Sequence, residues 1–195
     1  MPFNCIAVPD NSMFKHTPSG NLFVLKRTCS VKKLILTLYH QKANGSEIKA
    51  GHISASCKFS RTLVFERRND LDYFTIKFIF VNAGYRNTSL GTLLMLILTC
   101  EVVVNGGRYL YVVSPIYKAY GFYLQFGFHP APENVSRNYW VALDNLEDPD
   151  AGLQFQDKFE LIRSHKLWKG NIDIVYHSLK KKINSVFTPE VTYSG

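Results

Sequence analysis

The chain has 195 residues, of which 46% are apolar and 14% aromatic, and it carries a formal net charge of +8. A chain of this size and composition buries roughly two-thirds of its unfolded surface, so we expect a globular protein and exclude a disordered one. The start lacks the charged and apolar segments of a secretory signal, and no apolar run reaches the ~20 residues of a membrane span. We therefore expect a cytoplasmic protein with no membrane partner.

The cysteine pattern predicts no metal centre, and the charged residues form two blocks. The cysteines are widely spread, with no CxxC pair and no histidine at metal-ligand spacing: Cys5, Cys29, Cys57 and Cys100. This pattern favours reduced thiols and predicts no metal. An acidic stretch, 144–160, precedes a basic one, 161–182. Such blocks are usually solvated faces; the alternatives are a patch for a cationic substrate and a patch for an anionic ligand.

The first half of the chain predicts antiparallel strands. Residues 1–20 contain three prolines and are expected to be irregular. Four segments have strand composition: Leu22–Lys26, Val31–Gln41, Glu47–Lys58 and Tyr73–Val81. Asn44-Gly45, between the second and third of these segments, is typical of a hairpin turn.

The second half alternates helices and strands. The predicted order is a helix, a strand, a helix and a strand: Ser89–Asn105, Tyr109–Val113, Pro115–Gln125 and Tyr139–Leu143. Residues 172–186 fit either a strand or a helix. The first helix has one charge, Glu101, in its middle turns, so we expect the C-terminal segment or a second subunit of a homodimer to cover its outer side. Antiparallel strands followed by β-α-β-α-β predict an α+β fold with a mixed sheet.

A polar loop, Arg86-Asn87-Thr88-Ser89-Leu90-Gly91, joins the Tyr73–Val81 strand to the first helix. The first amides of a helix have no intrahelical partner, and the helix dipole favours an anion, so a loop of this kind can hold a phosphate. The alternative is an ordinary strand-turn-helix connection in which Ser89 caps the helix.

Two blocks of the sequence resemble the GCN5-related N-acetyltransferase (GNAT) superfamily, whose members transfer an acyl group from a coenzyme A thioester to an amine. The superfamily loop R/Q-x-x-G-x-G/A, preceded by V-x-P-x-Y, is matched at Val81, Tyr85, Arg86 and Gly91, while Ser89 replaces the middle glycine. The later pattern N-x-x-A-x-x-F-Y-x-x-x-G-F is matched at Ala119, Phe122, Tyr123, Gly127 and Phe128, while Ile116 replaces the asparagine. The resemblance covers roughly residues 46–143.

The resemblance implies a GNAT-like acyl-CoA N-acyltransferase fold, with a mixed, mostly antiparallel sheet that is splayed at a β-bulge and flanked by helices. It divides the chain into an irregular segment 1–20, an acyltransferase domain 21–145 and an extension 146–195 that packs on the core. The implied cofactor-binding residues are Phe80, Val81, Ala83, Arg86, Asn87, Thr88, Ser89, Leu90, Gly91 and Thr92. The diphosphate would lie on Arg86–Thr92, and the pantetheine arm and thioester carbonyl near Phe80–Ala83.

The resemblance also implies a catalytic acid at Tyr123, which would protonate the departing thiolate; the alternative is a tyrosine that only packs. The superfamily often carries the general base at the positions of Thr75 and Lys77, neither of which is a ready base at neutral pH. His52 on the neighbouring strand, or Tyr73 acting through a water, could serve as the general base in their place. The sequence does not decide between these candidates.

The leading hypothesis is an N-acyltransferase that moves an acetyl group from acetyl-CoA to a primary amine by direct attack. The acceptor would be a small molecule or a basic peptide or protein, and the acidic loop 147–150 could attract it. The alternative is a catalytically weak or inactive module that binds CoA or a protein partner. Nucleic acid is supported only by net charge and by Lys180–Lys182, and we do not expect it as a partner.

Overall fold

The computed structural model describes residues 8–30, 33–57, 73–104, 109–113, 115–130 and 167–190. The strands are β1 Met13–His16, β2 Leu22–Ser30, β3 Lys33–Gln41, β4 Glu47–Cys57, β5 Tyr73–Val81, β6 Tyr109–Val113, β7 Phe128–Pro130, β8 Leu167–Asn171 and β9 Phe187–Glu190. The helices are η1 Ala83–Tyr85, α1 Leu90–Val104, η2 Tyr117–Ala119, α2 Tyr120–Leu124 and α4 Ile172–Ile183.

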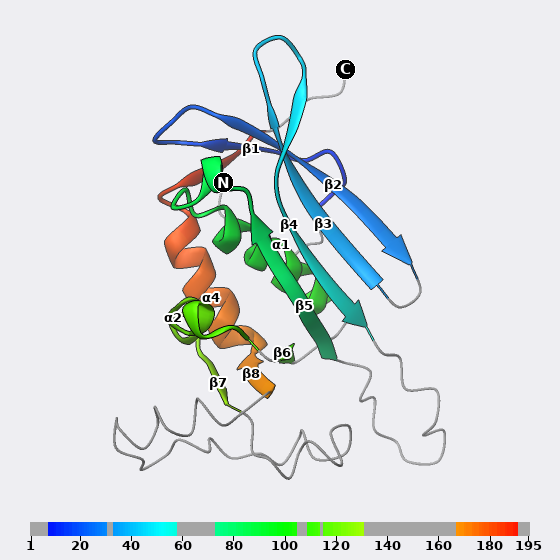
Figure 1. Ribbon diagram of the computed structural model, residues 1–195, viewed down its shortest axis with the longest axis vertical. Helices are drawn as coiled ribbons and strands as arrows, with labels where there is room; N and C mark the ends of the chain where they lie inside the picture. Colours follow the sequence, from blue (N-terminus) through cyan, green and yellow to red (C-terminus); the bar gives the residue numbers. More distant parts are fainter. Residues whose placement is uncertain are drawn as a thin grey trace.

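The strands of the described residues form one nine-stranded sheet in the order β7-β8-β6-β5-β4-β3-β2-β1-β9. Every neighbouring pair is antiparallel except β5 and β6, which run parallel. Helix α1 connects these two strands and packs against β3, β4, β5 and β6 (Figure 1). The predicted α+β fold with a mixed, mostly antiparallel sheet is confirmed.

The β3–β4 hairpin forms where Asn44-Gly45 predicts it. Gly45 has a φ of +80°, which a residue without a Cβ adopts at no steric cost, and the Lys42 amide donates to the Ser46 carbonyl. Strand β2 extends four residues beyond its predicted end at Lys26, as far as Ser30. The added residues are mostly exposed and polar, so apolar alternation could not reveal them.

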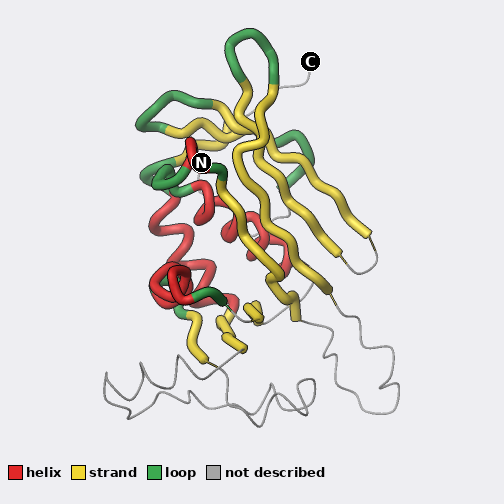
Figure 2. Tube along the Cα trace, viewed as in Figure 1, coloured by secondary structure: helices red, strands yellow, loops and turns green. Residues whose placement is uncertain are grey.

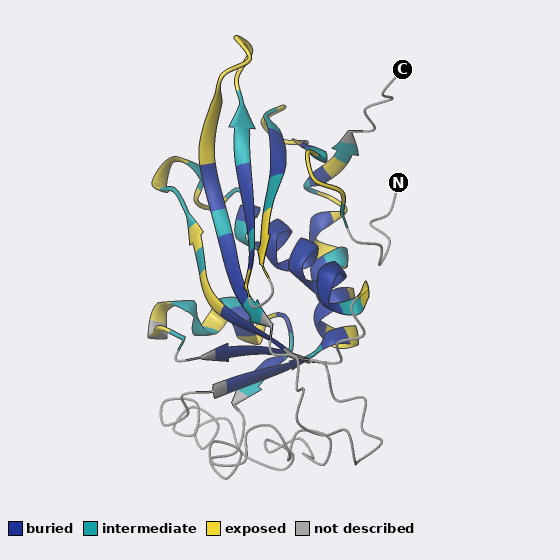
Figure 3. Cartoon of the chain, turned by 90° about the vertical axis from the view of Figure 1, so that its right-hand side faces the viewer, coloured by how far each residue is buried: buried dark blue, intermediate teal, exposed yellow. Residues whose placement is uncertain are grey.

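Helix α1 is the centre of the core. Figure 3 colours most of it as buried, and twelve of its fifteen residues are buried. Helix α4 packs against it, so the C-terminal segment covers α1, as one of the two predicted alternatives required. Glu101, the one charge in α1, forms an ion pair with Arg27 of β2. This pairing compensates a carboxylate that would otherwise be buried alone.

Residues 172–186, which the sequence leaves ambiguous, form helix α4 and its C-terminal turn. The Asn171 side chain accepts hydrogen bonds from the amides of Asp173 and Ile174 and thereby caps the helix. Lys180–Lys182 lie in the last turn, where positive charge complements the helix dipole. Apolar residues at helical spacing face the core, among them Val175, Leu179 and Ile183.

Three predicted elements differ from the structure. Residues 13–16 form strand β1 within the segment expected to be irregular. The predicted helix Pro115–Gln125 is shorter: it begins as the 3₁₀ turn η2 and continues as α2 only to Leu124. The C-terminal segment contributes β8 and β9 to the sheet itself, as the yellow strand segments of Figure 2 show. The predicted strand Tyr139–Leu143 lies outside the described residues, and the domain boundaries stay predictions.

Candidate cofactor-binding site

The loop between β5 and α1 presents an array of free backbone amides. Asn87 and Ser89 have φ values of 63° and 60°, in the left-handed region, and alternate with residues whose φ is not positive. Successive amides in such a conformation turn toward a common point and form a nest for an anion. Within the described part of the chain, none of the amides of residues 87–92 donates a hydrogen bond. Six donors, three of them at the N-terminus of a fifteen-residue helix, therefore await an acceptor.

The loop is anchored on both sides. The Tyr85 hydroxyl and His40 Nδ1 lie 2.9 Å apart, which fixes η1 to strand β3. The Thr88 hydroxyl donates to the Tyr85 carbonyl. Leu90 is buried at the start of α1. The amides are thus held in place before any ligand arrives, which lowers the entropic cost of binding.

The pairing of β5 with β6 ends five residues before the end of β5. The β5–β6 ladder covers only Tyr73–Ile76 of β5, and the β4–β5 register shifts between Ser54 and Ala55 so that Lys77 is an extra residue. This irregularity is a β-bulge, and bulges bend a strand and end its pairing. Residues 77–81 consequently have no partner strand on the β6 side among the described residues. The bulge that the resemblance implied is present, and the β5–β6 ladder ends directly before it.

Hydrogen-bond alternation identifies which backbone groups face this free edge. The Asn82 amide donates to the Ala50 carbonyl of β4, and Val81 is opposite Gly51. In an antiparallel ladder, successive residues direct their polar groups to opposite sides, so Phe80 faces β4 while Ile79 and Val81 face the free edge. Arg86 Nε lies 3.5 Å from the Val81 carbonyl, on that same side. Ile79 was not among the predicted residues, because its backbone role depends on register.

No protein-family profile matches the sequence, and no curated protein matches it. Solved structures with a similar chain path include Tetrahymena GCN5, with 16% identity, a TM-score of 0.44 and coverage of 73% of this chain and 70% of that one. A GNAT-family acetyltransferase of Staphylococcus aureus Mu50 has 15% identity and a TM-score of 0.43, over 72% and 68% of the two chains. A mutant of the AtaT toxin, bound to the C-terminus of the antitoxin AtaR and to acetyl-CoA, has 13% identity and a TM-score of 0.44, over 77% and 72%.

Identities and TM-scores this low support no conclusion about the residues or the activity of this chain. The internal observations are more specific: antiparallel strands lead to a bulged β5, a buried helix follows a polar loop, and the parallel β5–β6 ladder ends at Ile76. The chain has a GNAT-like fold.

Within this GNAT-like fold the two sequence blocks meet at the N-terminus of α1. A Cβ placed on Gly91 would lie 3.6 Å from the Phe122 ring and 3.8 Å from Val81 Cγ2. The loop, the free edge of β5 and helix α2 therefore adjoin one another. The remaining predicted cofactor residues differ in what they can offer. Leu90 and Thr92 have buried side chains, so only their amides are available to a ligand, whereas Ala83, Arg86 and Asn87 are exposed.

Tyr123 is buried to 6% exposure, against Phe122 and Phe128. Burial raises the pKa of its hydroxyl to about 12, because the phenolate would lose its hydration. The hydroxyl is therefore protonated at neutral pH and can donate a hydrogen bond. Complete transfer to a thiolate of ordinary basicity is uphill, but a thiolate in the same apolar surroundings is more basic too.

The two positions where the superfamily often carries a base differ in exposure. Thr75 is buried opposite Ser56, and Lys77 is exposed at the bulge. The imidazole of His52 lies on β4 opposite Phe80, and its ring centroid is 5.1 Å from that of Phe78. Burial, with a smaller contribution from the positive charge of Lys49, lowers the pKa of His52, so the imidazole is neutral at pH 7.

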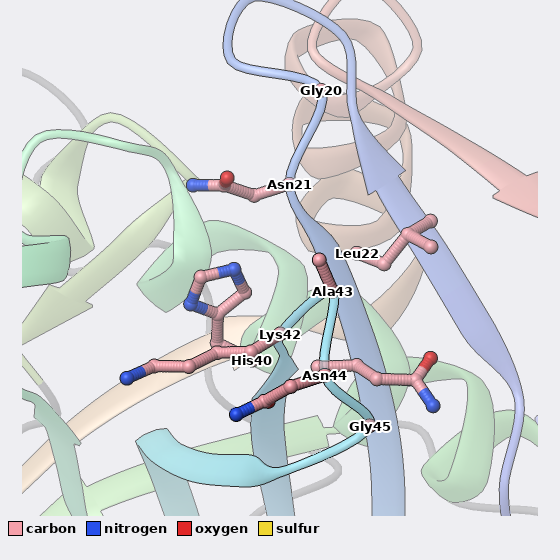
Figure 4. A pocket seen from close by; sticks show the side chains of 9 residues that line it. Gly20, Asn21, Leu22, His40, Lys42, Ala43, Asn44 and Gly45 are labelled. Atoms are coloured by element: carbon pink, nitrogen blue, oxygen red, sulfur yellow. The ribbon is translucent and has the colours of Figure 1, made fainter.

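A separate depression of about 860 Å³ lies between the β1–β2 turn and the β3–β4 hairpin (Figure 4). His40 and Lys42 are the only titratable residues among those that line it. His40 engages Tyr85, as described above. The free amides of the loop lie elsewhere, so we do not place the cofactor in this depression.

The charged segments are only partly described. Lys182 donates to Gln125 Oε1 at 2.8 Å and lies over the Phe126 ring, while Lys180 lies over the Tyr176 ring. These two lysines make intramolecular contacts that need no nucleic acid. The acidic loop 147–150 lies outside the described residues. None of the helices in the described part has the length and apolar character of a membrane span.

Proposed function

We propose that the chain is an acetyl-CoA-dependent N-acetyltransferase that moves the acetyl group to a primary amine by direct attack. The observation that carries the proposal is the set of six unengaged amides at residues 87–92, adjoining the free edge of a bulged β5. An anion nest followed by an unpaired strand edge matches a ligand that has a diphosphate at one end and an amide-bearing arm at the other.

The cofactor would lie along these groups in order. The diphosphate accepts hydrogen bonds from the amides of residues 87–92, and the Arg86 guanidinium supplies a charge. The pantetheine arm pairs with the backbone of Ile79 and with the amide of Val81, whose carbonyl accepts from Arg86 Nε. The amide of Ile79 or Val81 then polarises the thioester carbonyl, since a fixed N–H stabilises the oxyanion that develops on attack. No metal is required for these steps.

Tyr123 is the proposed proton donor to the departing thiolate. Its raised pKa keeps the proton on the hydroxyl until the C–S bond breaks and charge develops on sulfur. We expect Tyr123→Phe to retain acetyl-CoA binding and to lose turnover by about 10²–10⁴-fold, which is the usual contribution of a positioned acid. Unchanged turnover would remove Tyr123 from the mechanism and leave it as a packing residue.

Calorimetric titration with acetyl-CoA tests the cofactor site. Arg86→Ala should weaken binding by about 10–100-fold, because one hydrogen bond to a charged group contributes about 1.5–3 kcal/mol. Lys181→Ala, which removes an exposed positive charge from α4, is the matched control and should have no effect. Acetyl-pantetheine lacks the diphosphate, so its affinity should be the same for the wild type and for Arg86→Ala. An equal loss for both ligands would contradict the proposed position of the diphosphate.

A second candidate function is a module that binds CoA or a protein partner without turnover. It is favoured by the absence of Glu and His at positions 75 and 77, and by Ile116, which is 71% exposed where the superfamily often has asparagine. The two functions are distinguished by measuring thiol release from acetyl-CoA with a mixed panel of amines. Binding without release on any amine would favour the module.

A further inference from the structure

The sheet face opposite α1 carries an aromatic surface beside the bulge. Phe78 and Phe80 of β5 are each 46% exposed, although large apolar side chains are usually buried. The registers of β2, β3, β4 and β5 place Lys26, Thr37, His52 and Phe80 in one row across this face. The α1 side of the same strands is occupied by core residues such as Leu36 and Ile53.

His52 occupies this aromatic surface with an unused hydrogen-bonding atom. Its ring centroid lies 5.1 Å from that of Phe78 and 5.7 Å from that of Phe80. Nδ1 of His52 and the hydroxyl of Ser54, two residues along β4, are buried and have no hydrogen-bond partner among the described residues. Ser54 is only 1% exposed. A buried polar atom without a partner is costly, so two of them side by side on one face indicate a place for a polar ligand group.

The charges around this surface restrict which ligand fits. Lys49 lies on the same strand as His52, Lys26 on β2 and Lys77 at the bulge. Lys26 is paired with Glu47, so Lys49 and Lys77 supply the positive charge beside this surface among the described residues. This positive charge repels polyamines and lysine-rich peptides. Exposed phenylalanine rings, in contrast, stack on an aromatic body and attract a single ammonium group to their faces.

We infer that His52 accepts the proton of the acceptor amine, and that the acceptor is a primary amine on an aromatic or apolar body that rests on Phe78 and Phe80. The inference rests on the proposed function and specifies its acceptor side. The row from His52 to Phe80 ends at β5, whose other edge is the proposed pantetheine site. An amine above Phe80 therefore stands between the imidazole and the thioester.

Two protons leave the acceptor nitrogen in the proposed step. The acceptor arrives as an ammonium, and one of its protons passes to a His52 ring nitrogen and then to solvent. The amine nitrogen attacks the thioester carbon, the C–N bond forms, and the carbonyl electrons move to oxygen. When the carbonyl re-forms, the C–S bond breaks and the thiolate departs. The second nitrogen proton balances the protonation of sulfur, through Tyr123, and the products are the amide, the thiol and one proton. The neutral state of His52 at pH 7 suits this role.

The test uses the full chain with acetyl-CoA as donor and phenethylamine or spermidine as acceptor, over pH 5.5 to 9. We expect phenethylamine to be preferred in kcat/KM by at least about tenfold, as two ring contacts would give. His52→Gln should lower kcat by about 10²–10⁴-fold and leave acetyl-CoA binding unchanged. The decrease of kcat at acidic pH that the wild type shows should be absent from this variant. His177→Gln, on the exposed side of α4, should change none of these. Added imidazole should restore part of the activity of His52→Ala.

Several outcomes would overturn the inference. Retention of the acidic limb in His52→Gln would remove His52 as the proton acceptor, and a preference for spermidine would remove the acceptor class. If the wild type binds acetyl-CoA but acetylates neither amine, this inference is wrong while the cofactor site stands. If the wild type binds no acetyl-CoA, the proposed function fails, and the inference fails with it.

Discussion

Ser89 stands where related loops have glycine, and its φ of 60° lies in the left-handed region. That conformation costs an L-residue roughly 1–2 kcal/mol, and glycine avoids the cost. Glycine also increases the conformational entropy of the unfolded chain, and this effect cancels about 0.5–1 kcal/mol of the gain from relieving the strain. The Ser89 hydroxyl donates or accepts no hydrogen bond within the described part of the chain, so its removal is nearly neutral. We therefore expect Ser89→Gly to raise the free energy of unfolding by about 0.5–1 kcal/mol.

Thermal unfolding of purified protein measures this change. For a chain of this length the expected gain corresponds to a Tm increase of about 1–4 °C. Ser89→Ala keeps the Cβ and removes only the hydroxyl, so it is the matched control and should stay within about 0.5 kcal/mol of the wild type. Acetyl-CoA affinity should be retained in both variants, because the amides remain. A destabilised Ser89→Gly, or an equal gain in Ser89→Ala, would refute the argument from backbone strain.

Three further changes test other parts of the fold. Gly51→Ala would place a Cβ 2.8 Å from the Phe80 carbonyl oxygen, so we expect chemical denaturation to show a free energy of unfolding lower by about 1–3 kcal/mol. Acetyl-CoA binding should weaken as β5 shifts. An unchanged free energy of unfolding would contradict the close approach. Asn171→Ala removes the cap of α4 and should cost about 1 kcal/mol, whereas Asn171→Ser should cost little. Burial lowers the pKa values of His16 and His52 from 6.5, so the neutral imidazoles contribute to the free energy of unfolding above pH 6.5, and this contribution is lost as pH falls through the lowered pKa values. In His16→Gln, the free energy of unfolding measured by denaturation should therefore change less steeply with pH between pH 5 and 7.

The sequence predicts the elements whose signals are local. Asn44-Gly45 identifies the β3–β4 turn, and Gly45 adopts the positive φ that this dipeptide favours. The uniformly apolar α1 requires a covering element, and α4 provides it. The composition of the loop after β5 predicts an anion site, which stays a prediction; Ser89 in it adopts a positive φ, which glycine adopts at lower cost.

Features that depend on pairing between distant segments were not accessible in this way. Strand β1 is four residues long and depends on β9, about 170 residues away, for one of its two ladders, so no local pattern reveals it. The free-edge position of Ile79 follows from the β4–β5 register and not from its residue type. The unpartnered Nδ1 of His52 likewise depends on which side chains surround it.

The dependence of α1 on α4 has a consequence for synthesis of the chain. Val104 ends α1 and Ile183 ends α4, so at about 5–20 residues per second the apolar helix is made roughly 4–16 seconds before its cover. During that interval a nascent chain exposes surface that chaperones recognise and that promotes aggregation. A ribosome stalled before residue 167 would hold a chain with no α4, β8 or β9. We therefore expect slow codons downstream of α1 to lower the soluble yield more than slow codons upstream of it.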